Sequence, residues 1–247
     1  MIEIENVGTV RVLSLSSGRV NALDVELLEE LTTTIGELAR SDAGALVITG
    51  AGRVFCAGVE LNRVLGGGAD YTDRLVAGLS DVFVALFGYP GPTVAAINGA
   101  AIAGGCVLAC ACDRRLISPD ARIGTSEVRV GVPFPAAALE VVRYASGRHA
   151  EDVLLGGRLY RGGEAVSAGL AHRVVEEGLV EAAVAEAADL GGISADAYGN
   201  TKAQLRSPVL ARIAEAGGID SEVRRLWAAE STRQRIAESV ERMRRRD

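Results

Sequence analysis

Two loops built from small residues carry the backbone groups with the clearest chemical potential in this chain. The strand-like segment ALVIT at 45–49 leads into GAGRVFCAGVEL, and TVAAIN at 93–98 leads into GAAIAGGCVLA, which contains Gly104 and Gly105. Such turns leave backbone N–H groups unpaired, and small residues let a ligand approach them closely. Two loops of this kind could hold one oxyanion between them. A tight crossover between packed strands would need the same glycines, and the spacing alone leaves both interpretations open.

Other catalytic constellations are poorly represented. Cys106, Cys110 and Cys112 crowd into one segment, which is typical of small buried thiols in a reducing compartment. With only two histidines in the chain, we predict no metal site. The segment VITGAGRVF begins like a dinucleotide-binding fingerprint, but Phe55 stands at the third glycine position, which argues against a nucleotide-dependent dehydrogenase. The absence of a G-x-S-x-G motif argues against serine hydrolysis.

The elements that must position these loops alternate between strands and helices. A hairpin is expected over residues 2–15, and a helix from the N-cap candidate Asp24 to Arg40. A second helix is expected over 72–88, where the prolines that follow would end it. Further strands are expected at 45–49, 93–98, 114–118, 121–126 and 171–175, and further helices at 136–145, 151–156 and 179–190. This alternation predicts an α/β fold with parallel strand pairing.

The last part of the chain has a different character. It shows helical periodicity without intervening strands, so we predict a core over residues 1–192 and a helical region over 193–247. The apolar positions of this region need a partner surface, and another subunit is one candidate; they include Leu226, Trp227, Ile236 and Val240.

Composition narrows the class of protein. The 247 residues are 49% hydrophobic and 4% aromatic, enough for one large or two modest cores of a soluble globular protein. The net charge of −6 and the lack of a basic stripe predict no nucleic-acid partner. No apolar run approaches the ~18 residues of a bilayer span, and the N-terminus does not look like a signal peptide, so we predict no membrane partner and a cytoplasmic location.

Four stretches together resemble the enoyl-CoA hydratase/isomerase family, also called the crotonase family. They are RVNALDVELL at 19–28, GRVFCAGVEL at 52–61, PTVAAINGAAIAGGCVLACACDRRL at 92–116 and GTSEVRVGVP at 124–133. The resemblance implies an α/β, crotonase-like ββα spiral with a C-terminal helical trimerisation region, assembled as a homotrimer or a dimer of trimers. It also implies an acyl-CoA thioester as substrate, with CoA as part of that substrate and no separate cofactor.

The resemblance further suggests which residues form the site. Ala57 and Gly104 would each offer a backbone N–H to the thioester carbonyl oxygen, where removal of one such donor typically costs ~3 to 4 kcal/mol of transition-state stabilisation. The CoA portion would lie along RVNAL and CAGVEL, and the family usually has aspartate where this chain has Glu60. The residues implied in substrate binding are Arg19, Ala22, Cys56, Val59, Glu60, Leu61, Ala103, Gly105 and Val107.

One of the two carboxylates of the family hydratases is missing. Its position, three residues beyond Gly104, is occupied by Val107, whereas the second position is occupied by Glu127 in TSEV. Valine cannot transfer a proton, so hydration by a pair of carboxylates is impaired. A single base suffices to move a double bond from the 3 to the 2 position of an acyl-CoA, and the pattern resembles the Δ3,Δ2-enoyl-CoA isomerase branch, with Glu127 as base and then acid. Burial beside Val107 and Val128 should raise the pKa of Glu127.

Two alternatives stay open. A hydratase could recruit another acid, and Asp70, Tyr71 and Asp73 are candidates because the GGGADYTD segment is expected near the acyl pocket in this family. A family member that lacks the first glutamate could also bind an acyl-CoA without catalysis.

Overall fold

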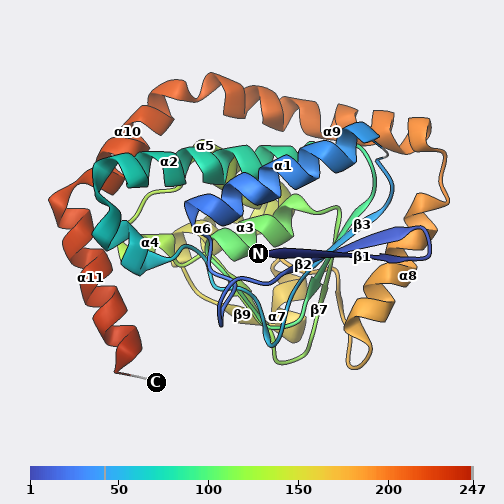
Figure 1. The fold of residues 1–247 in the computed structure, drawn as a ribbon, viewed down its shortest axis with the longest axis horizontal. Helices are drawn as coiled ribbons and strands as arrows, with labels where there is room; N and C mark the ends of the chain where they lie inside the picture. Colours follow the sequence, from blue (N-terminus) through green and yellow to red (C-terminus); the bar gives the residue numbers. More distant parts are fainter. Residues whose placement is uncertain (42, 246–247) are drawn as a thin grey trace.

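Strands of two sheets run through the centre of the molecule, and helices cover them (Figure 1). The computed structural model describes residues 1–41 and 43–245. One sheet has six strands in the order β1-β2-β3-β5-β7-β10, and the other has four in the order β4-β6-β8-β9. The strands are β1 (Ile2–Val7), β2 (Val10–Leu15), β3 (Leu46–Gly50), β4 (Val54–Cys56), β5 (Thr93–Ile97), β6 (Ala100–Ile102), β7 (Arg114–Ile117), β8 (Arg122–Gly124), β9 (Tyr160–Arg161) and β10 (Arg173–Val174).

The chain builds these sheets by repeating one unit. The pairs β3/β4, β5/β6 and β7/β8 each place one strand in the large sheet and the next in the small sheet. Within both sheets these strands pair in parallel; only the edge strands β1 and β9 are antiparallel to their neighbours. The structure thus confirms the predicted α/β fold and its ββα spiral.

Most helices lie at the predicted positions, but the second helix starts earlier than predicted, and two short helices over residues 127–130 and 162–167 were not predicted. They are α1 (Val25–Ser41), α2 (Leu61–Phe87), α3 (Gly104–Ala111), α4 (Glu127–Val130), α5 (Ala136–Ser146), α6 (Ala150–Gly156), α7 (Gly162–Ser167), α8 (Leu179–Gly191), α9 (Ala195–Glu215), α10 (Gly217–Ala228) and α11 (Glu230–Arg244), with a 3-10 turn at Gly147–His149. Helix α2 starts at Leu61 rather than at residue 72, because Gly68 adopts φ 75° and joins two helical segments across a kink. None of the helices in the described part of the chain has the length and apolar character that a bilayer span requires.

Packing on the large sheet has two sides. One side of the sheet packs in the main core with α1, α2, α3 and α5, whereas α8 covers the opposite face through Leu179, Ala183 and Ala187. Small residues on α8 allow the helix to lie close over β2, β3 and β5.

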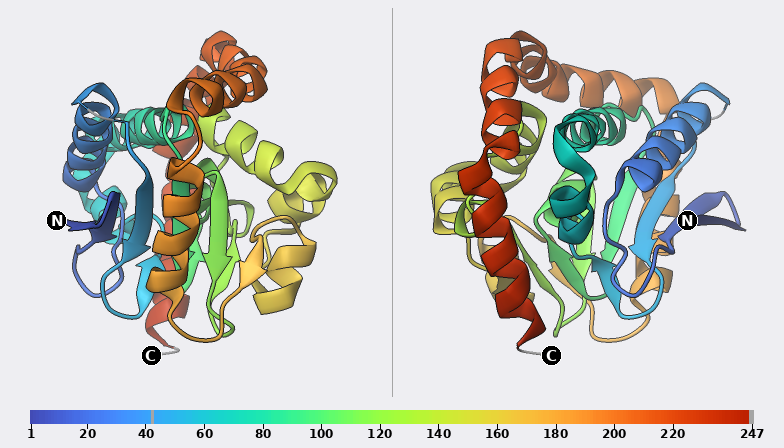
Figure 2. Two further views of the ribbon diagram at one scale, coloured as in Figure 1. Left: turned by 90° about the vertical axis from the view of Figure 1, so that its right-hand side faces the viewer. Right: turned by 60° about the vertical axis from the view of Figure 1, so that its left-hand side comes forward.

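The C-terminal helices pack on their own chain. Figures 1 and 2 show α9 and α10 over the top of the molecule and α11 descending beside α4. Trp227, Ile236 and Val240 are buried within this chain and Leu226 is half-buried, so their partner surface is provided by the same polypeptide, including α2. A second subunit, which the sequence left as one candidate, is therefore not needed to explain the burial of these side chains.

Candidate active site

Three parallel strands of the small sheet deliver the candidate site residues to one edge. Val59 comes three residues after β4, Gly104 two residues after β6, and Glu127 three residues after β8. Strands β4, β6 and β8 are adjacent and parallel, so their carboxyl ends meet at the same edge of the sheet. The spiral therefore brings together residues that lie up to 68 positions apart.

The two glycine loops touch each other. A Cβ built on Gly58 would lie 3.0 Å from the Ile102 carbonyl oxygen and 3.8 Å from the Gly104 nitrogen. Gly58 has φ 88°, a conformation that favours glycine, so the close approach and the turn both require this residue. The predicted convergence of the two loops is thus present.

The first backbone donor, however, differs from the one that the sequence suggested. The Ala57 N–H donates to the Val20 carbonyl oxygen at 3.0 Å, so it is already engaged. Leu23 pairs with the two residues on either side of Val59. Its N–H donates to the Gly58 carbonyl oxygen, and its own carbonyl oxygen accepts the Glu60 N–H. In this parallel bridge the N–H of Val59 points away from Leu23, and Val59 lines the cavity described below. The correction moves the candidate donor from Ala57 to Val59.

The second donor belongs to a strained helix start. Ala103 adopts φ 53° and ψ −121°, one of only two positive φ values among the described non-glycine residues, and directly precedes α3. Its own N–H donates to the Gly124 carbonyl oxygen, which ties this turn to the end of β8. The first intrahelical bond is made by Val107, so the N–H of Gly104 stands free at the positive end of α3. Strain of this kind is typical of functional sites.

Glu127 is the buried acid of the site. It begins α4, is 9% exposed, and its Oε2 atom is buried without a hydrogen-bond partner. Loss of solvation raises the pKa of the Glu127 carboxyl group to about 7, although backbone hydrogen bonds at Glu127 and Ser126 partly offset the rise. The rise agrees with the expectation from the sequence, but one of the two expected neighbours does not contribute: Val128 is an exposed residue, whereas Val107 is fully buried.

An apolar cavity of about 630 Å³ joins the two loops and the acid. Val59, Gly104, Val107 and Glu127 all line it, together with aliphatic and aromatic side chains from α2 and the C-terminal helices. Glu127 is the one carboxylate among the described residues of its wall. Asp70, Tyr71 and Asp73 do not line it: Asp73 forms an ion pair with Arg224 at 3.4 Å, and the Tyr71 hydroxyl is buried without a partner elsewhere. None of these three side chains therefore contributes an acid to the cavity wall.

The remaining predicted site residues divide into two groups. Ala57, Leu61 and Ala103 line the cavity as well. Outside the wall lie Arg19, Ala22, Cys56, Glu60 and Gly105. Glu60 instead caps α2, where its Oε1 accepts hydrogen bonds from the Asn62 backbone and side chain at 3.1 and 2.9 Å. Burial raises the pKa of the Cys56 thiol to about 12, which keeps it protonated and unreactive.

The site also contains residues that sequence reasoning missed. Trp227 from α10 lines the cavity, and its indole N–H donates to the Pro133 carbonyl oxygen at 2.9 Å. Ser239 and Arg242 from α11 complete the same wall. The apolar periodicity of the C-terminal region indicated a buried face, but nothing in it indicated that this face would close the cavity of its own chain. No group of His, Cys, Asp and Glu side chains suited to a metal ion occurs among residues 1–41 and 43–245.

Fold and cavity together define the class: an α/β spiral protein whose apolar cavity combines free backbone N–H groups with a single carboxyl group. A family model described as enoyl-CoA hydratase/isomerase matches residues 5–244. The chain belongs to the enoyl-CoA hydratase/isomerase family.

Individual relatives carry both activities in their descriptions. The chain is 38% identical over 184 residues to a putative enoyl-CoA hydratase of Thermus thermophilus, with 72% of each protein covered. It is 33% identical to the probable enoyl-CoA hydratase EchA8 of Mycobacterium tuberculosis, over 72% of this chain and 70% of the relative. Among solved structures, human mitochondrial Δ3,Δ2-enoyl-CoA isomerase superposes with a TM-score of 0.94 at 25% identity, covering 100% of this chain and 99% of the isomerase. These similarities establish the family and leave open which of the two reactions this chain catalyses.

Proposed function

We propose that the protein is a Δ3,Δ2-enoyl-CoA isomerase in which Glu127 is the only acid/base. The observation that carries this proposal is the cavity wall, where Glu127 is the single carboxylate among the described residues and Val107 occupies a second inward position. A double-bond shift needs one group that removes a proton and returns it, whereas addition of water needs that water to be activated and oriented as well.

The proposed reaction conserves atoms and electrons. The Glu127 carboxylate removes a proton from C2 of a 3-enoyl thioester, and the C–H electrons pass into the carbonyl to give a dienolate oxygen. The N–H groups of Val59 and Gly104 would bind that oxygen, where a mostly apolar wall lowers the local dielectric and so strengthens both interactions. The protonated Glu127 then donates to C4, which leaves the double bond at the 2 position.

The raised pKa of Glu127 suits this double role. A carboxyl group with a pKa of about 7 is a stronger base than an exposed glutamate, and it also retains the proton between the two transfers. The orphaned Oε2 atom is the one from which such a transfer would occur, because no protein donor occupies it.

A pair of substrates separates this proposal from its alternatives. Purified protein is assayed with a 3-enoyl-CoA for isomerisation and with a 2-enoyl-CoA for hydration, and the same assays are repeated with Glu127→Gln. Isomerisation by the native protein that falls at least ~10³-fold in the variant is the expected result. Hydration that survives Glu127→Gln would support a hydratase with another acid, in line with the names of the curated relatives. Tight acyl-CoA binding without turnover would support a non-catalytic role.

A second experiment tests the assignment of Val59. Val59→Pro removes the proposed donor N–H, whereas Val59→Ala retains it and changes only the side chain. Because the pairing with Leu23 uses Gly58 and Glu60 rather than the Val59 N–H, the loop keeps its hydrogen bonds. We expect turnover to fall by ~10² to 10³ in Val59→Pro and to stay within a few-fold in Val59→Ala, at matched melting temperatures. Full turnover in a folded Val59→Pro protein would exclude this donor.

The homotrimeric or hexameric assembly implied by the family remains part of the proposal. Sedimentation of the purified protein at several concentrations tests it directly.

A further inference from the structure

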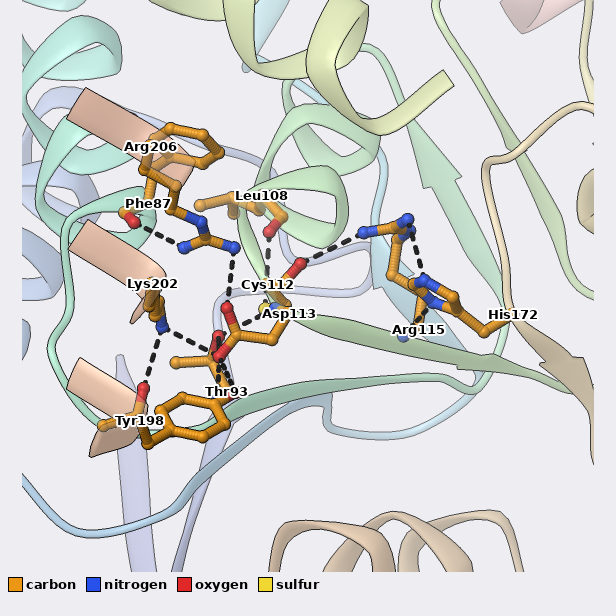
Figure 3. A network of polar contacts seen from close by, with 11 residues as sticks. Phe87, Thr93, Leu108, Cys112, Asp113, Arg115, His172, Tyr198, Lys202 and Arg206 are labelled. Atoms are coloured by element: carbon orange, nitrogen blue, oxygen red, sulfur yellow. Dashed lines mark hydrogen bonds and ion pairs between the residues drawn. The ribbon is translucent and has the colours of Figure 1, made fainter. Parts of the chain in front are cut away.

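A second cavity lies at the opposite end of α3 from the candidate active site. It encloses about 670 Å³ and shares no lining residue with the acyl cavity. Its wall comes from the segment after α3, from α5, from the residue before β10, and from α8 and α9. Figure 3 shows the polar network along this wall, with Asp113 bound from α9 on one side and Arg115 beside His172 on the other.

The charges of this wall do not balance. Asp113 is the one carboxylate among the described lining residues, and it is shared by Lys202 at 2.8 Å and Arg206 at 2.7 Å. A third lining cation, Arg114, pairs at 2.6 Å with Glu186, which lies outside the cavity. The wall therefore carries an excess of positive charge in a site where solvent screens it weakly.

Arg115 is the cation without a carboxylate. It is 5% exposed, and within the described chain its side chain contacts the carbonyl oxygens of Cys112 at 3.0 Å and Gly169 at 3.3 Å, together with the His172 ring. Its Nε atom is buried without any hydrogen-bond partner. A buried guanidinium that lacks both a counter-charge and a full set of acceptors is costly, so it indicates a missing acceptor.

The His172 ring points to the same missing acceptor. Its Nδ1 accepts the backbone N–H of Arg115 at 3.0 Å, so in the neutral ring the proton resides on Nε2. The ring is neutral at ordinary pH because burial and the two neighbouring arginines lower the pKa of His172 to about 4. Nε2 lies 3.4 Å from an Arg115 terminal nitrogen, so two N–H donors face each other there. One oxygen atom of an anion beside them would accept from both.

We propose that this cavity binds a small anion, a phosphate or a carboxylate, between Arg115 and His172. The anion supplies the negative charge that the wall lacks and the acceptor that both side chains need. Tyr144 and Leu205 border the cavity, so an organic body attached to the anionic group fits beside it. The site is separate from the acyl cavity and does not depend on the proposed isomerase activity.

Histidine NMR provides a direct test, because the chain contains only His149 and His172. The full-length protein is titrated with inorganic phosphate and, separately, with acetate, at constant ionic strength made up with chloride. We expect the His172 ring resonances to shift saturably while those of His149 do not. A response to phosphate alone identifies a phosphate site, and a response to both probes identifies a general oxyanion site. No saturable shift at His172 in the folded protein with either probe would overturn the proposal.

Variants then assign the binding to this wall. Arg115→Gln removes the charge but keeps an amide that can donate to the neighbouring carbonyls, and Arg173→Gln is the matched control at an exposed arginine next to His172. We expect phosphate to bind at least tenfold more weakly to Arg115→Gln and unchanged to Arg173→Gln. If Arg115→Gln does not fold, Arg115→Lys with calorimetric titration replaces it, and a loss of affinity of several-fold is expected because lysine lacks the forked donor set. Unchanged affinity in either folded Arg115 variant would refute the assignment.

Discussion

Replacing the buried acid should stabilise the protein while it abolishes catalysis. Glu127 has an ordinary pKa of 4.5 in an unfolded chain and about 7 in the folded protein, because burial disfavours its charged form. Between these two values the folded state holds a proton that the unfolded state has released, so stability falls as the pH rises through this window. A difference of about 2.5 pKa units corresponds to about 3 kcal/mol at pH 8, and to about 1 kcal/mol at pH 5, where the unfolded carboxyl is mostly but not fully charged.

Glu127→Gln removes this penalty, since the amide is never ionised and its oxygen can accept the same backbone hydrogen bonds. We expect urea unfolding to show the variant more stable than the native protein by about 3 kcal/mol at pH 8 and by about 1 kcal/mol at pH 5. At pH 8 the melting temperature should rise by roughly 6–12 °C for a chain of this size. The control is Glu177→Gln, at an exposed carboxylate, which should change stability little at either pH.

The same titration should appear in catalysis. The base form of Glu127 must be present in the free enzyme, so kcat/KM for a 3-enoyl-CoA should rise with pH and level off above about 7.

Two results of the unfolding experiment would contradict this reasoning. An equal stability gain for Glu127→Gln at pH 5 and pH 8, or a Glu127→Gln protein less stable than the native protein at pH 8, would show that desolvation of this carboxylate is not the dominant effect.

Three further substitutions test other parts of the structure. Val107→Glu places a second carboxyl group in the cavity. We expect this variant to hydrate a 2-enoyl-CoA at ~100-fold above the native level and to have a higher pKa at Glu127. The control Val107→Gln should not hydrate this substrate. Gly105→Ala would place a Cβ 2.1 Å from a backbone carbonyl oxygen and should lower the free energy of unfolding by about 3 kcal/mol. The control Gly66→Ala has open space around it and should be neutral or slightly stabilising. An equal loss of stability in both variants would contradict the packing argument. Asp113→Asn leaves Lys202 and Arg206 without their carboxylate and should lower the free energy of unfolding, measured by chemical denaturation, by about 3–5 kcal/mol. A loss below about 1 kcal/mol would show that backbone carbonyl groups alone satisfy the two cations.

The acyl cavity explains why residues from distant parts of the chain must be considered together. Its wall combines loops after strands of the small sheet, residues from both halves of α2 and the C-terminal helices. Trp227 is held in place by its hydrogen bond to the Pro133 carbonyl oxygen, so a helix near the end of the sequence contributes a fixed aromatic surface to the cavity that Glu127 also lines. The family resemblance identified the strand-end loops and implied a C-terminal helical region, but it did not indicate that these helices line the acyl cavity of their own chain.

Local sequence was sufficient for most elements and for the chemical type of the site. Periods of two and 3.6 residues predicted the strands and helices, since each depends on which neighbouring side chains share a face. The glycine loops alone were compatible with a shared oxyanion site or a tight crossover, and the family resemblance of these stretches favoured the first and identified Val107 and Glu127 as the positions of a lost and a retained acid. These features depend on residue type over short spans of chain.

Tertiary structure alone decided which groups are available. Whether an N–H is free depends on its hydrogen-bond partner: Val20, far from the loop in sequence, engages Ala57 and leaves Val59 as the candidate donor. Only the tertiary structure shows that Asp70, Tyr71 and Asp73 are absent from the cavity wall. The excess charge around Arg115 likewise arises because α9 brings Lys202 and Arg206 to the segment that follows α3. Free donors, excluded acids and unbalanced charges are properties of pairs of distant segments, and the sequence specifies them only through the fold.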